Sequence, residues 1–241
     1  MRTETFHTPG DALLRVRVPA GQVDIQTVDG ETTRVELESE PEVESEATVE
    51  AHGSEVVVEI EERRLFFLSR APRARVRISC PHGARIAFKG VSANLAVRGR
   101  TGAVEAQSVS GDTEFDHVDG TLEIKTVSGD VAVKTVAEGA AVRTVSGDIR
   151  IDQAEGPVTA RTVSGSHRLG SVAEGSVALR SVSGDMLIGV RRGTRVWMDV
   201  KSLSGKTSSE LPVGDQPLDG KGPTMELRAN STSGGIRITR A

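Results

Sequence analysis

The sequence predicts an all-β protein, built as a parallel β-solenoid with about 18 residues per coil and an N-terminal antiparallel β cap. Three observations predict it. Apolar and polar residues alternate along most of the chain, glycines recur every 8 to 10 residues from Gly102 to Gly184, and no stretch has the period of an amphipathic helix.

Residues 1–82 form the predicted N-terminal β-strand cap region. Apolar and polar residues alternate there with a period of two, which is typical of half-buried strands. Gly, Pro and Asp separate these segments, so an antiparallel sheet or small sandwich is expected. The segments are 13–19, 22–28, 33–39, 55–61 and 73–79.

Residues 83–208 carry the predicted solenoid repeats, in which two kinds of turn alternate. One kind is a Ser-Gly pair, at 110–111, 128–129, 146–147, 164–165, 183–184 and 204–205. The other is an acidic residue followed by Gly, at 119–120, 138–139, 155–156 and 174–175. One coil therefore has two strands and two different corners.

The residues between the corners indicate which side chains fill the interior. Leu122 and Ile124 share one parity with Thr126, whereas Val127 breaks it. We expect the corner to bend Val127 back into the core. An antiparallel meander is the alternative architecture, but it needs a second apolar layer that the sequence does not offer. A solenoid closes on itself and fills its own interior.

Residues 209–241 are expected to form a polar loop and C-terminal capping strands, because the spacing of the Ser-Gly corners loosens after Gly184. Such strands would protect the open edge of the last coil. We expect Trp197, the only tryptophan, to be the apolar plug of this end.

Composition excludes several functional classes. The formal net charge of -4 and the 2% aromatic content argue against nucleic-acid binding, so no nucleic acid is expected as a partner. The only cysteine, Cys80, is expected to be a buried apolar residue. The N-terminus is polar, and no apolar run is long enough for a transmembrane segment, so we expect a cytoplasmic protein.

No residue pattern predicts catalysis, a metal or a cofactor. Each Ser of a Ser-Gly pair is one of a series, whereas a catalytic serine should be singular. Asp112, Asp130 and Asp148 should stack in a column. The column could bind calcium, or its carboxylates could accept hydrogen bonds from backbone N–H groups of the turns. Other residue types replace Asp at the equivalent positions of other coils, which favours the turn role. The histidines are scattered and mostly expected at the surface: His7, His52, His82, His117 and His167.

A basic ladder is the main candidate binding face. Basic residues recur two positions before the Ser-Gly corner valine or leucine, and by parity they point outward. Coils stack about 4.8 Å apart, so acidic neighbours at the corners are expected to neutralise this column. The alternative is a linear docking face for an anionic strand or an acidic protein. The basic ladder comprises Lys125, Arg143, Arg161, Arg180 and Lys201.

A second candidate is the basic segment 63–77, which has two phenylalanines among its arginines. Basic residues beside exposed rings suit a partner or an anionic membrane surface. The alternative, which we favour, is a hairpin whose rings cap the solenoid. The residues of this candidate partner loop are Arg63, Arg64, Phe66, Phe67 and Arg70.

Several motifs together resemble a bacterial family of β-strand-repeat proteins of unknown function, often labelled "putative adhesin". They are the opening F-x-T-P from Phe6 to Pro9, the segment LLRVRVPAGQVDIQT, the S-G-D repeats, GVRRGTRVWMDV and the closing S-x-S-G-G-I-R-I. The resemblance covers most of the chain and implies a repetitive all-β fold without catalytic residues.

The favoured hypothesis is a non-enzymatic scaffold or interaction protein whose protein or anionic partner and oligomeric state are unknown. Two alternatives stay open. One is a polymer-forming cytoskeletal protein similar to the bactofilins, although capped ends would oppose it. The other is a polysaccharide-acting enzyme, which would need a groove with converging carboxylates.

Overall fold

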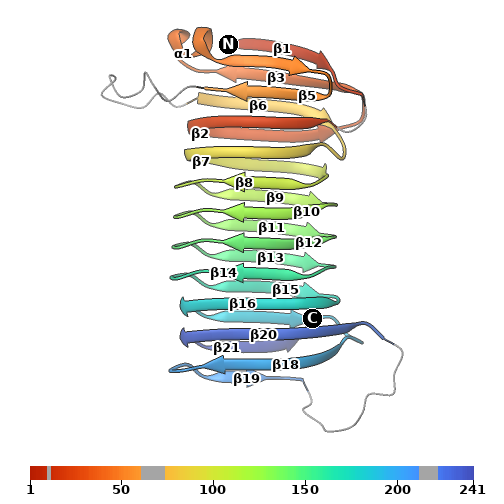
Figure 1. Cartoon of the computed structure of the whole chain (residues 1–241), viewed down its shortest axis with the longest axis vertical. Helices are drawn as coiled ribbons and strands as arrows, with labels where there is room; N and C mark the ends of the chain where they lie inside the picture. The colour runs from red at the N-terminus through yellow and green to blue at the C-terminus, as the bar shows by residue number, and fades with distance from the viewer. Residues whose placement is uncertain (10–11, 61–73, 212–221) are drawn as a thin grey trace.

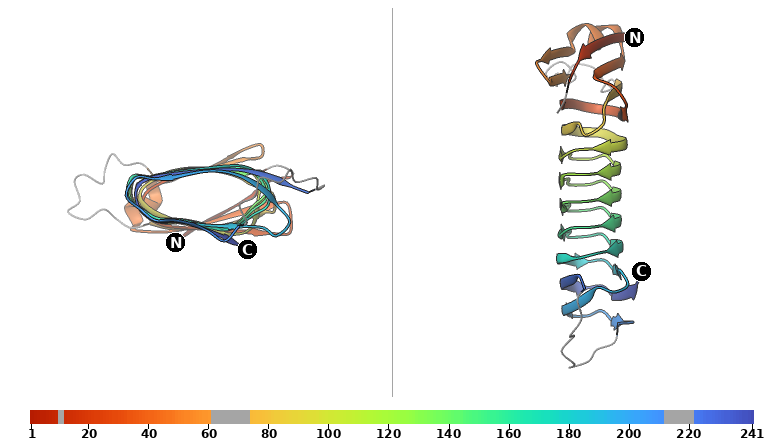
Figure 2. Two further views of the ribbon diagram at one scale, coloured as in Figure 1. Left: turned by 90° about the horizontal axis from the view of Figure 1, so that it is seen from below. Right: turned by 90° about the vertical axis from the view of Figure 1, so that its right-hand side faces the viewer.

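The computed structural model is an elongated rod built from stacked β-coils (Figure 1). It describes residues 1–9, 12–60, 74–211 and 222–241. Viewed along the rod, the coils superimpose as a flattened oval (Figure 2). Each coil contributes one strand to each of two broad faces, and the side chains between the faces form one continuous apolar core. The predicted all-β solenoid is therefore confirmed.

Face A, the first of these broad faces, consists of strands that follow one another along the rod from its N-terminal end. In that spatial order they are β4 (Thr48–His52), β5 (Glu55–Glu59), the first halves of β2 (Leu13–Val28) and β7 (Arg85–Thr101), β8 (Val104–Gln107), β10 (Thr121–Lys125), β12 (Gly139–Arg143), β14 (Val158–Arg161), β16 (Gly175–Ser183), β20 (Thr224–Ser233) and β18 (Arg195–Ser202).

The strands of face B follow the same direction on the other side of the core. They are β1 (Arg2–His7), β3 (Thr32–Glu38), β6 (Ala74–Pro81), the second halves of β2 and β7, β9 (Thr113–Val118), β11 (Val131–Val136), β13 (Ile149–Ala154), β15 (His167–Val172), β17 (Met186–Val190), β21 (Ile236–Arg240) and β19 (Thr207–Ser209).

Parallel pairing between coils follows the predicted period. Ile149 pairs with Val131 of one neighbouring coil and with His167 of the next, each 18 positions away. Because the register repeats, residues of one type stack in columns along the rod. The inward columns consist mainly of Val, Ile, Leu and Ala, and these side chains are almost fully buried.

The Ser-Gly corners need glycine because neighbouring coils approach closely there. A Cβ added to Gly147 would lie 2.2 Å from the carbonyl oxygen of Gly129, and one added to Gly165 would lie 2.1 Å from that of Gly147. No side chain fits at such distances. The glycine period that predicts the fold is therefore a steric requirement of stacking.

The valine before each corner points inward at the acidic corners and outward at the Ser-Gly corners. The expectation that the corner bends Val127 back into the core is therefore wrong. Val136, at an acidic corner, is buried, whereas Val127 is 48% exposed. Ser110, Ser128 and Ser146 form parallel bridges between coils, so the extended backbone continues into the Ser-Gly corner. Side-chain alternation continues with it, and Val127 points outward like Lys125.

Both ends of the rod contain a coil that is out of chain order. At the N-terminal end, β2 pairs with β5 and β6 on one side and with β7 on the other. At the C-terminal end, β20 lies between β16 and β18, and β21 lies between β17 and β19 (Figure 1). At the N-terminal end, parallel coils therefore extend beyond the 83–208 repeat region. At the C-terminal end, β20 and β21 are inserted before the last coil, which β18 and β19 form, so the strands expected to cap this end do not cap it.

The N-terminal end also contains the predicted antiparallel cap. β3 pairs antiparallel with β1 and β6, and β4 pairs antiparallel with β5. One short helix, α1 (Pro41–Glu46), lies among these strands. The sequence predicts no helix there, because α1 has no buried residue and therefore no amphipathic pattern to detect.

Trp197 is not the plug of the C-terminal end. Its side chain is 57% exposed on β18, and the guanidinium of Arg228 lies 5.8 Å from the centre of its ring. That geometry suits a cation–π contact at the surface. The inward residues of β18 are instead Val196, Met198 and Val200, which are partly buried against the core.

Candidate functional site

The basic ladder lies on face A, and its four N-terminal members stack as predicted. Lys125 pairs in register with Arg143, Arg143 with Arg161, and Arg161 with Arg180. Lys201 does not follow directly, because the inserted strand β20 places Asn230 between Arg180 and Lys201. Each coil adds about 4.8 Å to the column.

The two lysines of the ladder are neutralised by acids on their own strands. The ammonium of Lys125 lies 2.6 Å from a carboxylate oxygen of Glu123, and Lys201 lies 2.9 Å from Asp199. The hydrogen bond from Lys125, together with its charge, lowers the pKa of Glu123, and the charge of Arg143 adds to this. These two members of the ladder are neutralised, but by acids on their own strands rather than by the acids expected at the corners.

The three central arginines do not match that expectation. Arg143, Arg161 and Arg180 are exposed, and none makes an ion pair with a described residue. The outward neighbours two positions earlier on their strands are small: Ala141, Thr159 and Ala178.

Three of the corner acids, Glu155, Asp130 and Asp148, have other partners. Nη1 and Nη2 of Arg191 donate to the two carboxylate oxygens of Glu155, at 2.7 and 2.5 Å, and the hydrogen bond from Arg191 lowers the pKa of Glu155. Oδ1 of Asp130 accepts the backbone N–H of Asp148 at 2.8 Å, and Oδ1 of Asp148 accepts that of Ser166. The aspartate column thus has the turn-stabilising role that the sequence suggests.

A column of exposed valines runs beside the basic ladder, two positions further along each coil. Their exposed fractions range from 39% to 50%. The sequence does not predict this column as long as the corner is assumed to bend inward. We define the valine column as Val91, Val109, Val127, Val145, Val163 and Val182.

A shallow hollow lies at the N-terminal end of the two columns, over three coils, and includes Lys125 as its one member of the basic ladder. It has a volume of about 310 Å³ and lies between the basic or polar side chains of Lys89, Gln107 and Lys125 and the valines Val109 and Val127. Face A therefore combines positive charge, an apolar edge and a hollow between them.

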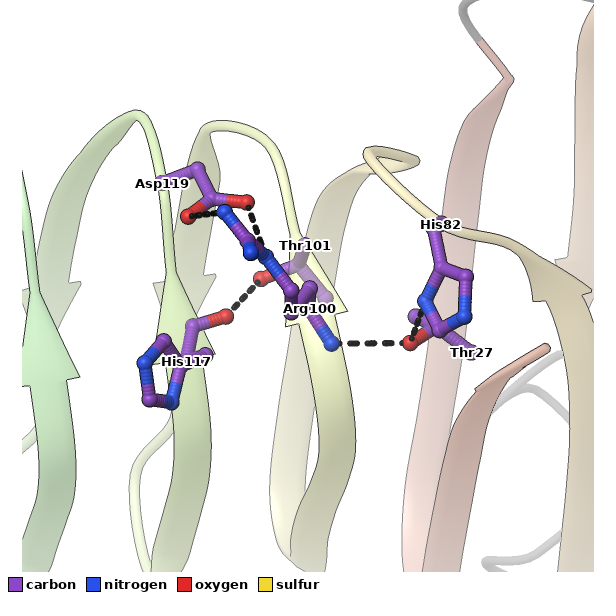
Figure 3. Close-up of polar contacts among 6 residues, drawn as sticks. All are labelled: Thr27, His82, Arg100, Thr101, His117 and Asp119. Carbon is purple, nitrogen blue, oxygen red and sulfur yellow. Dashed lines mark hydrogen bonds and ion pairs between the residues drawn. The ribbon is translucent and has the colours of Figure 1, made fainter. Parts of the chain in front are cut away.

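A separate polar cluster joins the neighbouring strands β2, β7 and β9 and the corner that follows β6 (Figure 3). Nδ1 of His82 lies 2.8 Å from the hydroxyl of Thr27, and Nε2 of His82 lies 3.5 Å from Asp29. The imidazole thus lies within contact distance of a hydroxyl through one nitrogen and of a carboxylate through the other. The hydroxyl of Thr27 also accepts the backbone N–H of Arg100 at 2.8 Å, and a Cβ on Gly99 would lie 2.3 Å from it.

This cluster joins neighbouring coils rather than presenting a free nucleophile. Thr27 is only 5% exposed, and its oxygen is enclosed by the backbone of β7. The next coils are joined similarly: Arg100 makes a bidentate pair with Asp119, at 2.9 and 3.1 Å, and the hydroxyl of Thr101 donates to the carbonyl of His117. Sequence reasoning could not bring Thr27 and His82 together, because they lie 55 positions apart.

His167 is buried rather than at the surface. It occupies the inward column of Ile149 and Met186 and is 1% exposed. Neither ring nitrogen makes a hydrogen bond with a described residue. Burial lowers the pKa of His167 to about 4, although the backbone of Arg180 and the charge of Asp148 partly oppose this effect.

Cys80 is fully buried, as expected, and burial raises the pKa of its thiol to about 12. In the described ranges, no three His, Cys, Asp or Glu residues converge as metal ligands would. No helix in these ranges could span a membrane. The candidate partner loop of Arg63, Arg64, Phe66, Phe67 and Arg70 lies outside the described residues.

Comparison with protein families assigns this rod to a known group. The family model described as Toastrack DUF4097 matches residues 14–238, which is nearly the whole chain. The chain belongs to the toastrack family. The resemblance to β-strand-repeat proteins is thereby confirmed, and the toastrack family has no established function.

A solved structure also supports this fold. A protein of Bacteroides fragilis, described as a putative adhesin, aligns over 98% of this chain and 96% of its own, with a TM-score of 0.62 and 12% identity. A putative adhesin of Parabacteroides distasonis covers the same shares with 8% identity and a TM-score of 0.40. At 12% identity, the likeness to the Bacteroides fragilis protein supports the fold alone. No curated protein matches the chain.

Proposed function

We propose that this toastrack protein is a non-enzymatic interaction scaffold that docks an anionic partner on face A. The observation that supports this proposal is the stack of Arg143, Arg161 and Arg180, exposed and without an ion pair among the described residues. Like charges about 4.8 Å apart repel one another, so an external anion would relieve that repulsion.

The scaffold presents this charge with little conformational cost. The three arginines project from adjacent strands of one hydrogen-bonded sheet, so their backbone positions are fixed before binding. Guanidinium groups also offer planar, paired donors that suit carboxylates or phosphates. A preorganised row of such donors favours a linear partner over a single small anion.

The test is affinity capture from a native lysate with three forms of the protein. One is the wild type, one carries Arg143→Glu, Arg161→Glu and Arg180→Glu, and the control carries Arg150→Glu, Arg168→Glu and Arg237→Glu. The control changes the same number of charges at outward positions of face B. We expect the face A variant alone to lose the captured partner, with binding that weakens as salt rises.

Equal retention by all three forms would refute the proposal. Equal loss from both variants would also refute it, because the effect would then follow net charge rather than face A. Circular dichroism and thermal unfolding of each variant would verify that the coils remain folded.

The polymer-forming alternative is less well supported. End-to-end stacking of a solenoid needs an open parallel coil at each end. Beyond the first parallel coil of this rod lie α1 and the antiparallel strands β1, β3 and β4. Analytical ultracentrifugation at increasing concentration would support the alternative if species much larger than small oligomers formed.

A further inference from the structure

We infer that the partner of face A is an acidic amphipathic α-helix, lying along the rod over the basic ladder and the valine column. This inference rests on the proposed function and adds the chemistry of the occupant. Three properties of the surface support it: the pairing of charge with apolar area, the spacing of the columns, and the position of the aspartate column.

The first property is the combination of two columns. Arg143 and Val145 point outward from the same coil, with buried Thr144 between them, and the pattern repeats at Arg161 and Val163. Residues two apart on a strand are about 6.7 Å apart. That separation is less than the diameter of a helix with its side chains, about 10 Å, so one helix can cover both columns.

The second property is the repeat along the rod. Coils repeat about every 4.8 Å, and a helix repeats every 5.4 Å. Acidic residues on three successive turns of a helix would follow Arg143, Arg161 and Arg180 with a mismatch of about 1 Å over two coils. Residues on the same side of an extended peptide lie about 6.7 Å apart, so the third such residue would lie about 4 Å away from the third arginine of the column.

The length of the surface also suits a helix of ordinary size. The valine column extends over neighbouring coils from Val91 to Val182, which is about 24 Å. A helix of about 16 residues covers that length. Acidic residues on one edge of its contact face and aliphatic residues on the other would match the ladder and the valines.

The third property argues against a membrane or a polyanion as the occupant. On the far side of the valine column lie the exposed carboxylates of Asp112, Asp130 and Asp148. They would repel an anionic lipid surface that reached the valines. A polyphosphate or nucleic acid has charge for the arginines but no aliphatic group to cover Val145 and Val163.

The test uses peptide display on the full-length protein. A library of random 18-residue peptides is selected on the wild type, and the affinity of each enriched peptide is then measured for the wild type and for three variants. We expect enriched peptides to carry Asp or Glu at helical spacing, with Leu, Ile or Val on the adjacent helix edge.

Two of the variants measure the two columns separately. We expect Arg143→Gln, Arg161→Gln and Arg180→Gln to weaken a selected peptide at least about tenfold. We expect Val145→Thr, Val163→Thr and Val182→Thr, which keep the β-branched shape, to weaken it by about threefold to tenfold.

The third variant is a matched control on face B, with Arg150→Gln, Arg168→Gln and Arg237→Gln. It loses the same number of positive charges as the arginine variant of face A and should bind like the wild type. The peptide should also gain helical circular dichroism when it binds, because the inferred occupant is a helix.

Several results would overturn the inference. They are enriched peptides without helical periodicity, binding insensitive to the valine changes, loss of binding in the face B control, or no enrichment at all. Tighter binding to vesicles containing phosphatidylserine, or to polyphosphate, would assign face A to that partner instead. In those two cases the proposed anionic docking face would stand while the helix would be rejected. Retention of the lysate partner by the face A glutamate variant would reject both.

Discussion

Lowering the pH should destabilise the rod through a single buried histidine. The ordinary pKa of 6.5 applies to His167 in the unfolded chain, whereas burial lowers the pKa in the folded rod to about 4. Between pH 6.5 and about pH 4 the unfolded chain therefore binds a proton that the folded chain does not. Stability is lost as the pH falls from about 6.5 to 4 and changes little below that range, because both states are then protonated.

The magnitude follows from this difference in proton affinity. A pKa lowered from 6.5 to about 4 corresponds to about 3 kcal/mol of unfolding free energy lost at pH 4, and to about 2 kcal/mol at pH 5. These values are large beside the total stability of a typical domain, about 5–15 kcal/mol. One buried imidazole should therefore dominate the acid response of its coil.

The assay compares the wild type with His167→Met, a replacement that matches Met186 in the same column. Urea unfolding at pH 7, 6, 5 and 4 gives the free energy of unfolding of each protein. Carboxylates titrate in both proteins, so the difference between them isolates His167. We expect this difference to grow by about 3 kcal/mol between pH 7 and pH 4. A difference that stays flat over this range would refute the reasoning.

Three further predictions concern the corners and the core. Gly147→Ala should lower the unfolding free energy by about 2–4 kcal/mol in urea, because its Cβ would lie 2.2 Å from the Gly129 carbonyl oxygen. Gly30 also has a positive φ, of 130°, but open space around its Cβ, so Gly30→Ala should carry the backbone strain without the contact and cost less. Equal costs would contradict the steric argument. Thr144→Val should raise the free energy of unfolding by about 1 kcal/mol and the melting temperature with it, because the buried Thr144 hydroxyl has no hydrogen-bond partner in the described structure. A destabilised variant would contradict this. Cys80, with a thiol pKa of about 12, should react with an aromatic disulfide reagent only after unfolding in urea, and fast reaction of the native protein would show that this part of the core opens readily.

The repeat makes much of the fold predictable from sequence. Because every coil has nearly the same length, residues 18 positions apart occupy the same place, and this is enough to stack Arg143 on Arg161. The same register places His167 in the inward column of Ile149, so the sequence also contains the signal for its burial. The general tendency of histidine to lie at surfaces hides that signal.

Other features depend on information that the period does not contain. The letters Thr-Val precede both corners, yet Val127 points outward and Val136 points inward. At the Ser-Gly corner, strand pairing continues through Ser128, so side chains keep alternating. Before the acidic corner, Lys134 is not paired with the neighbouring coils although Val133 and Thr135 are, and the alternation is interrupted there. Only the three-dimensional path of the backbone distinguishes the two.

The spatial order of the coils is equally hidden. Local sequence specifies that 224–240 forms a coil, but not that this coil lies between β16–β17 and β18–β19. For this reason the sequence predicts Lys201 next to Arg180 and does not predict their separation by Asn230. The contact between Thr27 and His82 escapes prediction because β2 is likewise inserted out of chain order.

The inserted C-terminal coil has a consequence for synthesis on the ribosome. β18 and β19 leave the ribosome before β20 and β21, yet among the described strands they pair only through them. A nascent chain that ends near residue 211 therefore lacks the strands on which its last coil docks, and β16 and β17 each have an edge open to an incorrect partner. Assembly of this end cannot proceed coil by coil in the order of translation. It is completed only when β20 and β21 have left the ribosome and can pair with β16 and β17 on one side and with β18 and β19 on the other.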